Sequence, residues 1–538
     1  MRRYGKAVLA AALALAVSGY LPAGGNRAKS GAGGAGGAAK NEVIIGFSSI
    51  PAHYDPLQGF GTNGQLIFST LVETDVAMNI VPDLARAYTV SADALTLTFT
   101  IRADARFTDG TQVKASDVAF TYNTIKQNAT SIDLSVMQSC TVSGNDTVVI
   151  KLTKPQSVFM LTVTQIGIVP EHLYNADFGL HPVGSGPFKL VQHDVDQQFI
   201  LEANTGYYRT VPAIKRVVFL KMADEDTRLM AARSGQVDIT MTSAVTAAVT
   251  KIPGYRLLRE ASVDNMGIAM PVVPVAGNVT ADGYPIGNNV TADSAVRKAL
   301  AYGLDRRQLC DDALNGFASP AYSENDGMPW WNPESVIQTD VAYAKSLLDK
   351  AGWIDADGDG IREKNGTRAS FPLLYFAGDS VRQAVAMSAA NQAKAQLGIE
   401  IRVEGVGSSD LLPRMFSEPM ILAWGSSNPR TSYLLFHSSN AGRNDWYNPE
   451  NFRNTTVDRY LDQALNAVSI EASIPFWRQA QWDGSTGTSM KGEAPYVFLI
   501  NKDHLYWVRT GLNTGKQKIH AHGDAWPLVA NLRDWKWE

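Results

Sequence analysis

Strand-type and helix-type segments alternate along nearly the whole chain, and this mixture most limits the folds open to it. Residues 41–50, 96–110 and 146–155 carry the apolar clustering or alternation of β-strands. Residues 114–127 and 293–316 instead repeat apolar side chains along one face of an α-helix. Mixed elements of this kind favour α/β lobes over an all-α or all-β fold. Because 538 residues exceed what one core can hold, we expect about three units.

Capping residues predict where the helices begin and end. Ser116 is expected to cap the helix of residues 114–127, and Gly316 to end a single long helix over residues 293–316. Gly352 is expected to end another helix. Further predicted elements are helices over residues 64–74, 342–353, 380–398 and 457–468 and a strand over residues 399–406.

The first forty residues predict export. Residues 1–23 have the form of a signal peptide, and residues 24–40 form a flexible Gly/Ala linker with too little apolar surface to fold. Val17-Ser18-Gly19 fits the first three places of a lipobox, but Tyr20 stands in the place of the lipidated cysteine and cannot form a thioether. We expect an exported protein, either periplasmic or tethered to the outer face of the cell membrane. The alternative is an uncleaved N-terminal anchor.

Charge and cysteine content exclude several classes of protein. The net charge of −4 gives no reason to expect nucleic acid or an anionic membrane as a partner. Cys140 and Cys310 form no CxxC motif, which argues against a zinc ribbon and against thioredoxin-type redox chemistry. The sequence leaves open whether these two cysteines are bridged. No stretch after the signal peptide is apolar enough to span a membrane.

The sequence lacks the motifs of common hydrolases, metalloproteases and nucleotide-binding enzymes. Residues 184–186 are Gly-Ser-Gly, but Pro187 removes an amide that a phosphate cradle would need, so this stretch predicts a tight turn. A secreted hydrolase or peptidase with Ser426 or Ser427 as nucleophile is the alternative function. Neither serine has a histidine partner at motif spacing.

The acidic stretch of residues 355–366 has two interpretations. Asp355, Asp357 and Asp359 match the first ligands of an EF-hand loop. The bidentate glutamate at the twelfth place is missing, and only Glu363 is near enough to substitute. The stretch is therefore either a structural Ca²⁺ site or an acidic turn with Asx hydrogen bonds. No other cofactor is expected.

Several stretches carry a pattern that spans the chain from residue 41 onward. They are "LVETDVAMNIVPDLARAYTV", "VGSGPFKLVQH", "ANTGYY", "DEDTRLMAARSGQVDI", "VRKALAYGLDRRQL", "AYAKSLLDKAGW" and "TVDRYLDQAL". In this order they resemble the signature of the extracellular solute-binding proteins of the peptide/nickel/opine class of ABC importers, family 5.

The resemblance implies an α/β fold of the type II periplasmic-binding-protein kind, in which two lobes joined by a hinge enclose the ligand. It also implies a monomer without catalytic residues that delivers a small molecule or peptide to a membrane-embedded ABC importer. The expected limits are residues 41–265 for lobe 1, with an extra subdomain over about 75–180, residues 266–498 for lobe 2, and residues 499–538 for a return to lobe 1. Hinge strands are expected near residues 262–272 and 494–502.

Residues 421–430, "ILAWGSSNPR", are implied to run from a second-lobe strand into the ligand cleft. Trp424 would form a rigid apolar wall able to stack on flat groups or contact a cation. Ser426, Ser427 and Asn428 would supply neutral hydrogen bonds. Peptide-binding members commonly carry an acidic residue here for the peptide's ammonium group, and this stretch has none. That difference disfavours a peptide with a free N-terminus and leaves a metal chelate, an opine-like compound or a peptide held by its backbone.

Other residues are implied to lie beside the same cleft. The alternative for the aromatic residues among them is core packing, and for the histidines a solvated loop. Arg382 and Arg430 are candidates to pair with a ligand carboxylate. His520 and His522 are expected at the surface, with a metal-ligand pair as the alternative. The remaining candidates are His53, Tyr54, Trp330, Trp331, Tyr433, His437, Trp446 and Tyr447.

Overall fold

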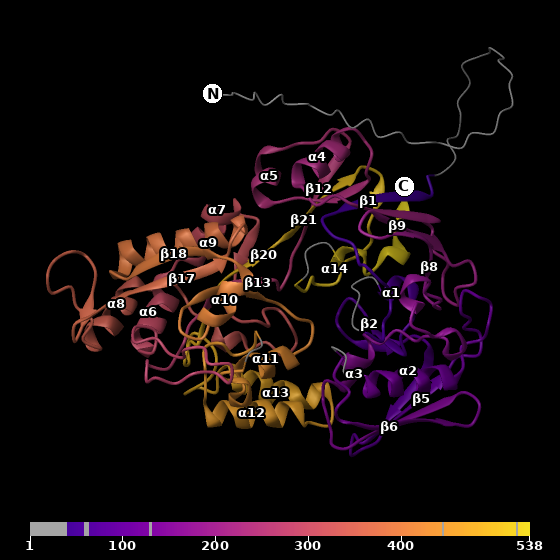
Figure 1. Ribbon diagram of the computed structural model, residues 1–538, viewed down its shortest axis with the longest axis horizontal. Helices are drawn as coiled ribbons and strands as arrows, with labels where there is room; N and C mark the ends of the chain where they lie inside the picture. Colours follow the sequence, from indigo (N-terminus) through magenta and orange to yellow (C-terminus); the bar gives the residue numbers. More distant parts are fainter. Residues whose placement is uncertain (1–39, 59–63, 129–131, 444–445, 523–525) are drawn as a thin grey trace, which may run out of the picture. The chain divides into compact units, whose positions relative to one another are not determined.

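The computed structural model describes residues 40–58, 64–128, 132–443, 446–522 and 526–538 (Figure 1). The predicted signal peptide of residues 1–23 and the linker up to residue 39 lie outside these ranges. Within the described ranges, no helix is long and apolar enough to cross a bilayer.

Two large β-sheets organise the described part of the chain. The first has seven strands in the order β12-β21-β11-β1-β10-β9-β8, and the second has six in the order β14-β20-β13-β19-β17-β18. Strand β1 forms as predicted, because Val43, Ile45 and Phe47 alternate along it and are fully buried. The bounds in the first sheet are Glu42–Phe47 (β1), Phe188–Asp194 (β8), Gln198–Ala203 (β9), Arg216–Lys221 (β10), Ile239–Met241 (β11), Tyr255–Glu260 (β12) and His504–Arg509 (β21). Those in the second are Asn265–Ala269 (β13), Ala318–Pro320 (β14), Ser370–Phe376 (β17), Glu400–Val406 (β18), Met420–Trp424 (β19) and Tyr496–Lys502 (β20).

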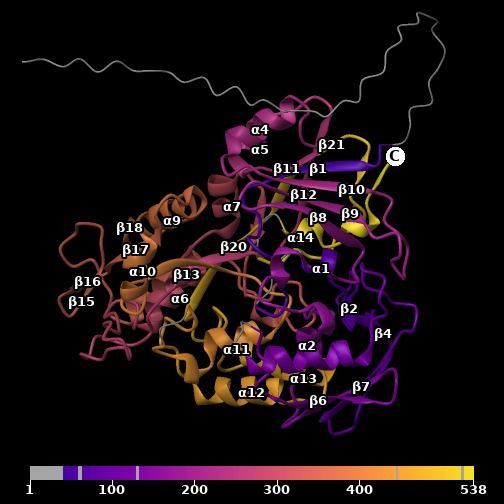
Figure 2. The same ribbon diagram turned by 45° about the vertical axis from the view of Figure 1, so that its right-hand side comes forward.

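A smaller sheet has the strand order β4-β5-β7-β6. Helix α2, Ala115–Gln127, packs on β6 and β7 (Figure 2). The predicted cap was wrong, because Ser116 lies inside α2 and the Asp117 carboxylate accepts a hydrogen bond of 2.8 Å from the Lys114 N–H. The strands are Ala85–Val90 (β4), Thr96–Ile101 (β5), Met137–Ser143 (β6) and Thr147–Leu152 (β7).

The chain passes between the two large sheets at two connections. Residues 261–264 lead from β12 in the first sheet to β13 in the second, and Asp503 leads back from β20 to β21. We call the seven-stranded and four-stranded sheets with their helices the first lobe, and the six-stranded sheet with its helices the second lobe. The connections lie within or beside the segments predicted as hinges, and movement about them stays a prediction.

Two predicted helices differ from the observed ones. Residues 293–316 form two helices, because the Asp305 carboxylate accepts hydrogen bonds of 2.9 and 3.1 Å from the first N–H groups of α7 and starts a new helix. Residues 64–74 are helical only over α1, Gly64–Ile67, and then form strand β2, Val72–Thr74. Gly316 and Gly352 follow their helices in left-handed conformations (φ +77° and +85°), as predicted.

The other helices of the described chain are short or medium in length. Those of the first lobe are Phe159–Val163 (α3), Glu225–Arg233 (α4), Ala244–Val249 (α5) and Trp526–Val529 (α14). Those of the second lobe are Ser294–Gly303 (α6), Arg306–Leu314 (α7), Val341–Lys350 (α8), Ser380–Gln392 (α9), Ser408–Arg414 (α10), Arg430–Phe436 (α11), Thr455–Leu465 (α12) and Ile470–Gln481 (α13).

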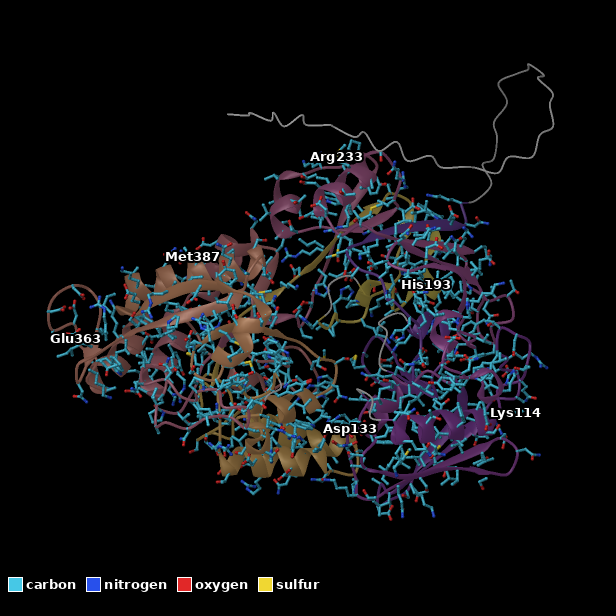
Figure 3. The ribbon with its side chains drawn as sticks, in the orientation of Figure 1. Lys114, Asp133, His193, Arg233, Glu363 and Met387 are labelled. Atoms are coloured by element: carbon cyan, nitrogen blue, oxygen red, sulfur yellow. The ribbon has the colours of Figure 1, made fainter. Side chains whose placement is uncertain are left out.

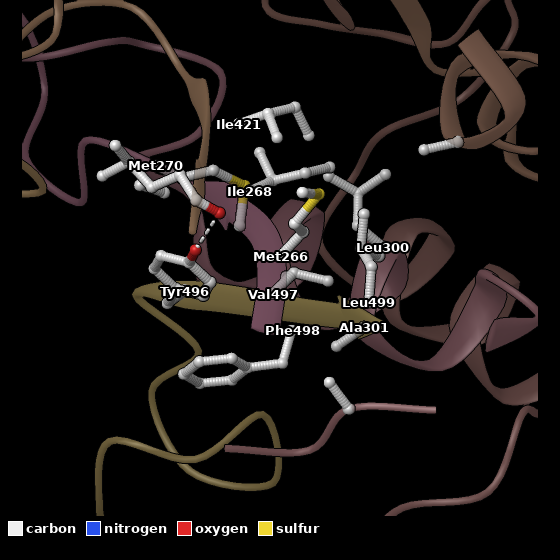
Figure 4. Packing of buried hydrophobic residues seen from close by; sticks show 14 of the residues in the cluster. Met266, Ile268, Met270, Leu300, Ala301, Ile421, Tyr496, Val497, Phe498 and Leu499 are labelled. Carbon is white, nitrogen blue, oxygen red and sulfur yellow. Dashed lines mark hydrogen bonds between the residues drawn. The ribbon is translucent and has the colours of Figure 1, made fainter. Parts of the chain in front are cut away.

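The core of the second lobe is built around the central strands β13, β19 and β20 (Figure 4). Met266, Ile268 and Leu499 are buried there. The Tyr496 hydroxyl lies among them and donates a hydrogen bond of 2.6 Å to the Leu422 carbonyl, so the one polar atom of this side chain is satisfied.

The two cysteines lie in different cores. Cys140 packs in the first lobe and Cys310 in the second, and both are free thiols. Burial raises the pKa of each thiol to about 12, so both stay protonated and unreactive at neutral pH. A bridge between them, which the sequence left open, is therefore not formed.

Candidate ligand-binding cleft

The turn that follows β19 packs closely against the first connection between the lobes. Gly425 has φ +155°, and a Cβ placed on it would lie 2.2 Å from the Val263 carbonyl oxygen. The His522 N–H donates a hydrogen bond of 3.0 Å to the Gly425 carbonyl. Glycine is needed here because any side chain would push the turn away from the connection.

Hydrogen bonds within residues 426–430 shape the predicted binding turn. The Ser426 hydroxyl accepts a hydrogen bond of 3.0 Å from the Asn428 N–H, and the Asn428 side chain accepts one of 3.0 Å from the Arg430 N–H at the start of α11. The Arg430 guanidinium forms an ion pair with Asp133, which precedes β6 in the first lobe (Figure 3). The turn is thus preformed, and Arg430 ties it to the opposite lobe.

The predicted aromatic wall is present in part. Trp424 is half-buried and stacks on Tyr447 with ring centroids 5.4 Å apart, and its indole N–H is buried with no acceptor among the described residues. Trp446 packs on Phe376 at the same end of the second lobe. Trp424 therefore presents only part of its ring, and the remainder is structural.

Several predicted binding residues have their side chains engaged elsewhere. Tyr54 is 2% exposed in the first-lobe core, against Phe199, because its ring completes that core. The Arg382 guanidinium forms an ion pair with Asp379, one helical turn away, so its charge is already compensated. His53 is exposed. Tyr433 and His437 stack on each other with ring centroids 4.4 Å apart.

A network of buried polar groups positions Trp330. Its indole N–H donates a hydrogen bond of 2.9 Å to Asn325, whose amide donates to Ser432 at 2.8 Å and to the neighbouring Glu324 carboxyl at 2.8 Å. Burial raises the pKa of Glu324 to about 7, so this carboxyl is partly protonated at neutral pH. Trp331, next in the chain, is half-buried, and its indole N–H has no acceptor in the described part of the chain.

A cavity of about 440 Å³ lies between the lobes. The second lobe contributes Trp330 and residues of α13, and the first lobe contributes residues around β3 (Ile80–Pro82), the four-stranded sheet and α3. Its lining is largely apolar, with Met78, Tyr88, Leu97, Phe159, Met160, Leu161, Trp330, Ile470 and Ile474 among the side chains. Such a cavity suits the apolar part of a small ligand.

A second cavity of about 210 Å³ adjoins the first and shares Met78 and Leu161 with it. Ser427 of the predicted turn lines it from the second lobe. Sequence reasoning missed five of the other polar side chains, which come from segments far apart in the chain and carry no local motif: Gln65, Thr74, Thr164, Gln165 and Lys518. His520 and His522 also line the cavity, although the sequence predicted them at the surface or as a metal-ligand pair.

A buried polar network lies at the connections between the lobes. The Asp264 carboxylate, with no exposed surface, contacts Lys502 at 3.1 Å, His504 at 3.2 Å and His522 at 2.7 Å. Burial alone would raise the pKa of Asp264, but the Lys502 ammonium and the hydrogen bonds from both histidines hold it well below its usual range. Asp264 is therefore ionised at every physiological pH.

The surface position predicted for His520 was wrong. Its Nδ1 lies 3.1 Å from Nδ1 of His504, and its side chain is 1% exposed. Burial, together with the charge of His504, lowers the pKa of His520 to about 3, so this ring stays neutral. The backbone of His520 ties it to the first connection, because its carbonyl accepts a hydrogen bond of 2.8 Å from the Val263 N–H and its own N–H donates one of 3.3 Å to the Ala261 carbonyl.

The acidic loop uses its carboxylates to hold its own backbone. Asp355 accepts hydrogen bonds of 2.8 and 3.0 Å from the Gly358 and Gly360 N–H groups. Asp359 pairs with Arg368. Of the described residues, Asp355, Asp357 and Glu363 bring carboxylate oxygens within 4.8 Å of one another, so Glu363 replaces Asp359 in this group. The donor set is that of a Ca²⁺ site, but it lacks the bidentate ligand of an EF-hand.

Two α/β lobes are joined by two connections and share a cleft that side chains of both lobes line. This arrangement is that of a two-lobed binding protein. The chain matches the bacterial extracellular solute-binding proteins, family 5 Middle, over residues 79–446, and it belongs to that family. This match confirms the predicted resemblance and, with it, solute binding over the hydrolase alternative.

Known relatives agree with this assignment. Protein XP55 of Streptomyces lividans is 32% identical over 87% of this chain and 85% of its own length. The structure of NikZ from Campylobacter jejuni in complex with Ni(L-His) has a TM-score of 0.75 at 22% identity and covers 93% of this chain and 100% of its own. That of AppA from Bacillus subtilis in complex with a nonapeptide has a TM-score of 0.68 at 21% identity and covers 93% and 99%. The structural likenesses confirm the predicted fold class.

Proposed function

We propose that this protein captures a peptide, a nickel chelate or an opine-like compound outside the cytoplasmic membrane and delivers it unchanged to an ABC importer. It acts as an exported monomer, periplasmic or tethered to the outer face of the membrane. The observation that carries the proposal is the pair of adjoining cavities lined by side chains of both lobes. NikZ and AppA, which share the fold, hold Ni(L-His) and a nonapeptide.

The smaller cavity contains the groups that the hydrolase alternative would need. Asp264 holds the His522 ring through Nδ1 at 2.7 Å, as a carboxylate orients a catalytic imidazole, and Ser427 lines the same cavity. No hydrogen bond joins Ser427 to His522 among the described residues, and the Ser426 hydroxyl is engaged within its own turn. We propose that these groups bind ligand and carry out no chemistry.

Ligand binding is expected to close the cleft. A ligand held by both lobes favours the closed arrangement by its difference in affinity between the two states. Ligand retained on purification is identified by native mass spectrometry and removed, and small-angle scattering is then recorded with and without it. We expect a smaller radius of gyration with ligand, a change in tryptophan fluorescence, and recovery of the ligand unchanged. Equal radii together with a reaction product would establish the enzyme instead.

Trp424→Ala is expected to weaken binding of that ligand by about 2 kcal/mol, roughly 30-fold in Kd, because it removes the exposed part of the aromatic wall. The matched control is Trp482→Ala, since Trp482 is also half-buried in the second lobe but lies outside the predicted binding turn. Neither tryptophan is among the residues that line the two cavities. Calorimetry gives the affinities, and thermal unfolding shows the loss of packing in each variant. An unchanged affinity in Trp424→Ala would assign this residue to the core alone.

We propose that the acidic loop is a turn stabilised by its own hydrogen bonds. Its carboxylates accept backbone N–H groups, and Asp359 already has a cationic partner. The melting temperature is therefore expected to be the same in chelator and in millimolar Ca²⁺. A rise with Ca²⁺ that Asp357→Asn abolishes would establish a structural site, because a ligand that binds only the folded state stabilises it by mass action.

A further inference from the structure

We propose that the smaller cavity is a subsite for a ligand carboxylate and that Lys518 is the residue that holds it. This inference rests on the proposed function and deepens it, since it defines which end of the ligand the hinge side of the cleft recognises.

The Lys518 ammonium is half-buried at the cavity wall. It donates a hydrogen bond of 3.1 Å to the Thr74 hydroxyl, and both residues line the cavity. An ammonium group has three N–H donors, so two remain after this bond. In the part of the chain that the structure describes, no carboxylate lies within ion-pair distance of this nitrogen. Burial lowers the pKa of Lys518, which is the sign of a cation that lacks full compensation.

The acidic groups nearest to Lys518 are already engaged. Glu73 acts on its charge most strongly, but Glu73 accepts bidentate hydrogen bonds of 2.9 Å from Arg533 and also pairs with Arg209. Asp75 and Asp534 act on the Lys518 charge more weakly; Asp75 already accepts hydrogen bonds from Ala77 and Asn79, and Asp534 lies 3.9 Å from the Arg533 guanidinium. The described lining of the smaller cavity contains no aspartate or glutamate. Lys518 also borders a neighbouring cavity of about 280 Å³, and the acidic residues of that cavity are Glu73, Asp75, Asp83 and Asp534.

Neutral polar groups face the cavity from both lobes. The side chains of Gln165 in the first lobe and Ser427 in the second have no hydrogen-bond partner among the described residues, and both line the cavity. A carboxylate bound to Lys518 can accept further hydrogen bonds from donors of this kind, and charge-assisted hydrogen bonds are stronger than neutral ones. One anionic group would in this way contact both lobes.

The rest of the ligand then extends into the larger, mostly apolar cavity, which the smaller one adjoins at Met78 and Leu161. This orientation, with the anionic end of the ligand at Lys518, accounts for the absence of acidic residues from the binding turn. Residues 424–430 contain no acidic side chain for a ligand ammonium group, and the charged residue of the adjoining cavity is a lysine. We infer that the ligand is held by its anionic end.

The test compares matched probes with and without a carboxylate. The probes are two equimolar libraries of tri- to pentapeptides, one with free C-termini and one amidated, together with Ni²⁺ complexes of L-histidine and of L-histidinamide and an opine-like N-carboxyalkyl amino acid in its acid and amide forms. Native mass spectrometry selects the binding probe, and calorimetry measures its acid and amide forms. We expect the wild-type protein to bind the acid form at least tenfold more tightly than the amide form. Lys518→Gln should bind both forms equally, and Lys518→Arg should keep the preference.

Lys516→Gln is the matched control, since Lys516 lies two residues away, is exposed and is absent from the lining of the smaller cavity. It should keep the wild-type preference. Equal melting temperatures of the two Gln variants would show that the fold is intact. An acid preference that survives in Lys518→Gln, or wild-type protein that binds both forms equally, overturns the carboxylate subsite alone. Wild-type protein that binds none of the probes contradicts the proposed function itself.

Discussion

Asp264→Asn is expected to lower the free energy of unfolding by about 3–5 kcal/mol, as found when one member of a buried ion pair is removed. Asp264 is fully buried between Lys502, His504 and His522, so its replacement removes the negative charge that these three side chains share. Because this network joins both connections between the lobes, the variant should also lose the change in radius of gyration on ligand binding. Denaturant unfolding at pH 7 measures the first effect and small-angle scattering the second.

Asp196→Asn is the control for this prediction. Asp196 pairs with Lys221 at 2.6 Å, but its side chain is 74% exposed. Exposed ion pairs contribute about 0–1 kcal/mol, so the control should be nearly neutral. A loss in Asp264→Asn no larger than in Asp196→Asn would mean that the network at the connections adds nothing to stability.

Glu450→Gln is expected to stabilise the protein by about 3 kcal/mol at pH 7. The Glu450 side chain is 2% exposed, its Oε2 has no hydrogen-bond partner among the described residues, and burial raises its pKa to about 8. Between the ordinary pKa of about 4.3 and pH 8, the folded protein holds a proton that the unfolded chain releases. The unfolding free energy therefore falls by about 1.4 kcal/mol for each pH unit as the pH rises through this window. Glutamine has the same shape and cannot ionise.

The comparison is made by denaturant unfolding at pH 4.5, 6 and 8. The gain from Glu450→Gln should be near zero at pH 4.5 and grow with pH. Glu324 and Asp326 have pKa values raised by burial to about 7 and about 6, so a smaller slope remains in the variant. Glu471→Gln, at an exposed site, should leave the profile unchanged. Identical slopes in wild type and Glu450→Gln would show that Glu450 ionises normally.

Local sequence correctly predicted the features that depend on contacts within a few residues. Apolar residues in 42–47 predicted β1, and Gly352 ended α8, because the alternation of side chains along a strand and a left-handed cap both depend on near neighbours. The strands that pair with β1, which are β10 and β11, come from distant parts of the chain. The ordered motifs predicted the fold class and solute binding through their resemblance to a known family. Residues 293–316 show the limit, since the helical pattern is continuous but a single capping aspartate divides it.

The surroundings of individual side chains came only from the tertiary structure. The pattern "HAH" contains no sign that His520 is buried, because its ring partner is His504, the first residue of β21, which in turn contacts Asp264. Tyr54 follows an exposed histidine in a turn-rich stretch, yet it packs in the first-lobe core. Whether a side chain is buried depends on which distant segments of the chain pack against it.

The sequence by itself determined the class of elements and the family, and the binding role of residues 424–430 stays a prediction. Only the tertiary structure decided the composition of the cleft. Lys518 and Thr74, hydrogen-bonded across one cavity, are 444 residues apart in the chain, and Ser427 reaches the same cavity from the other lobe. Recognition depends on the distances between side chains that converge on a ligand, and those distances arise when both lobes fold around the paired connections at Asp264 and Asp503.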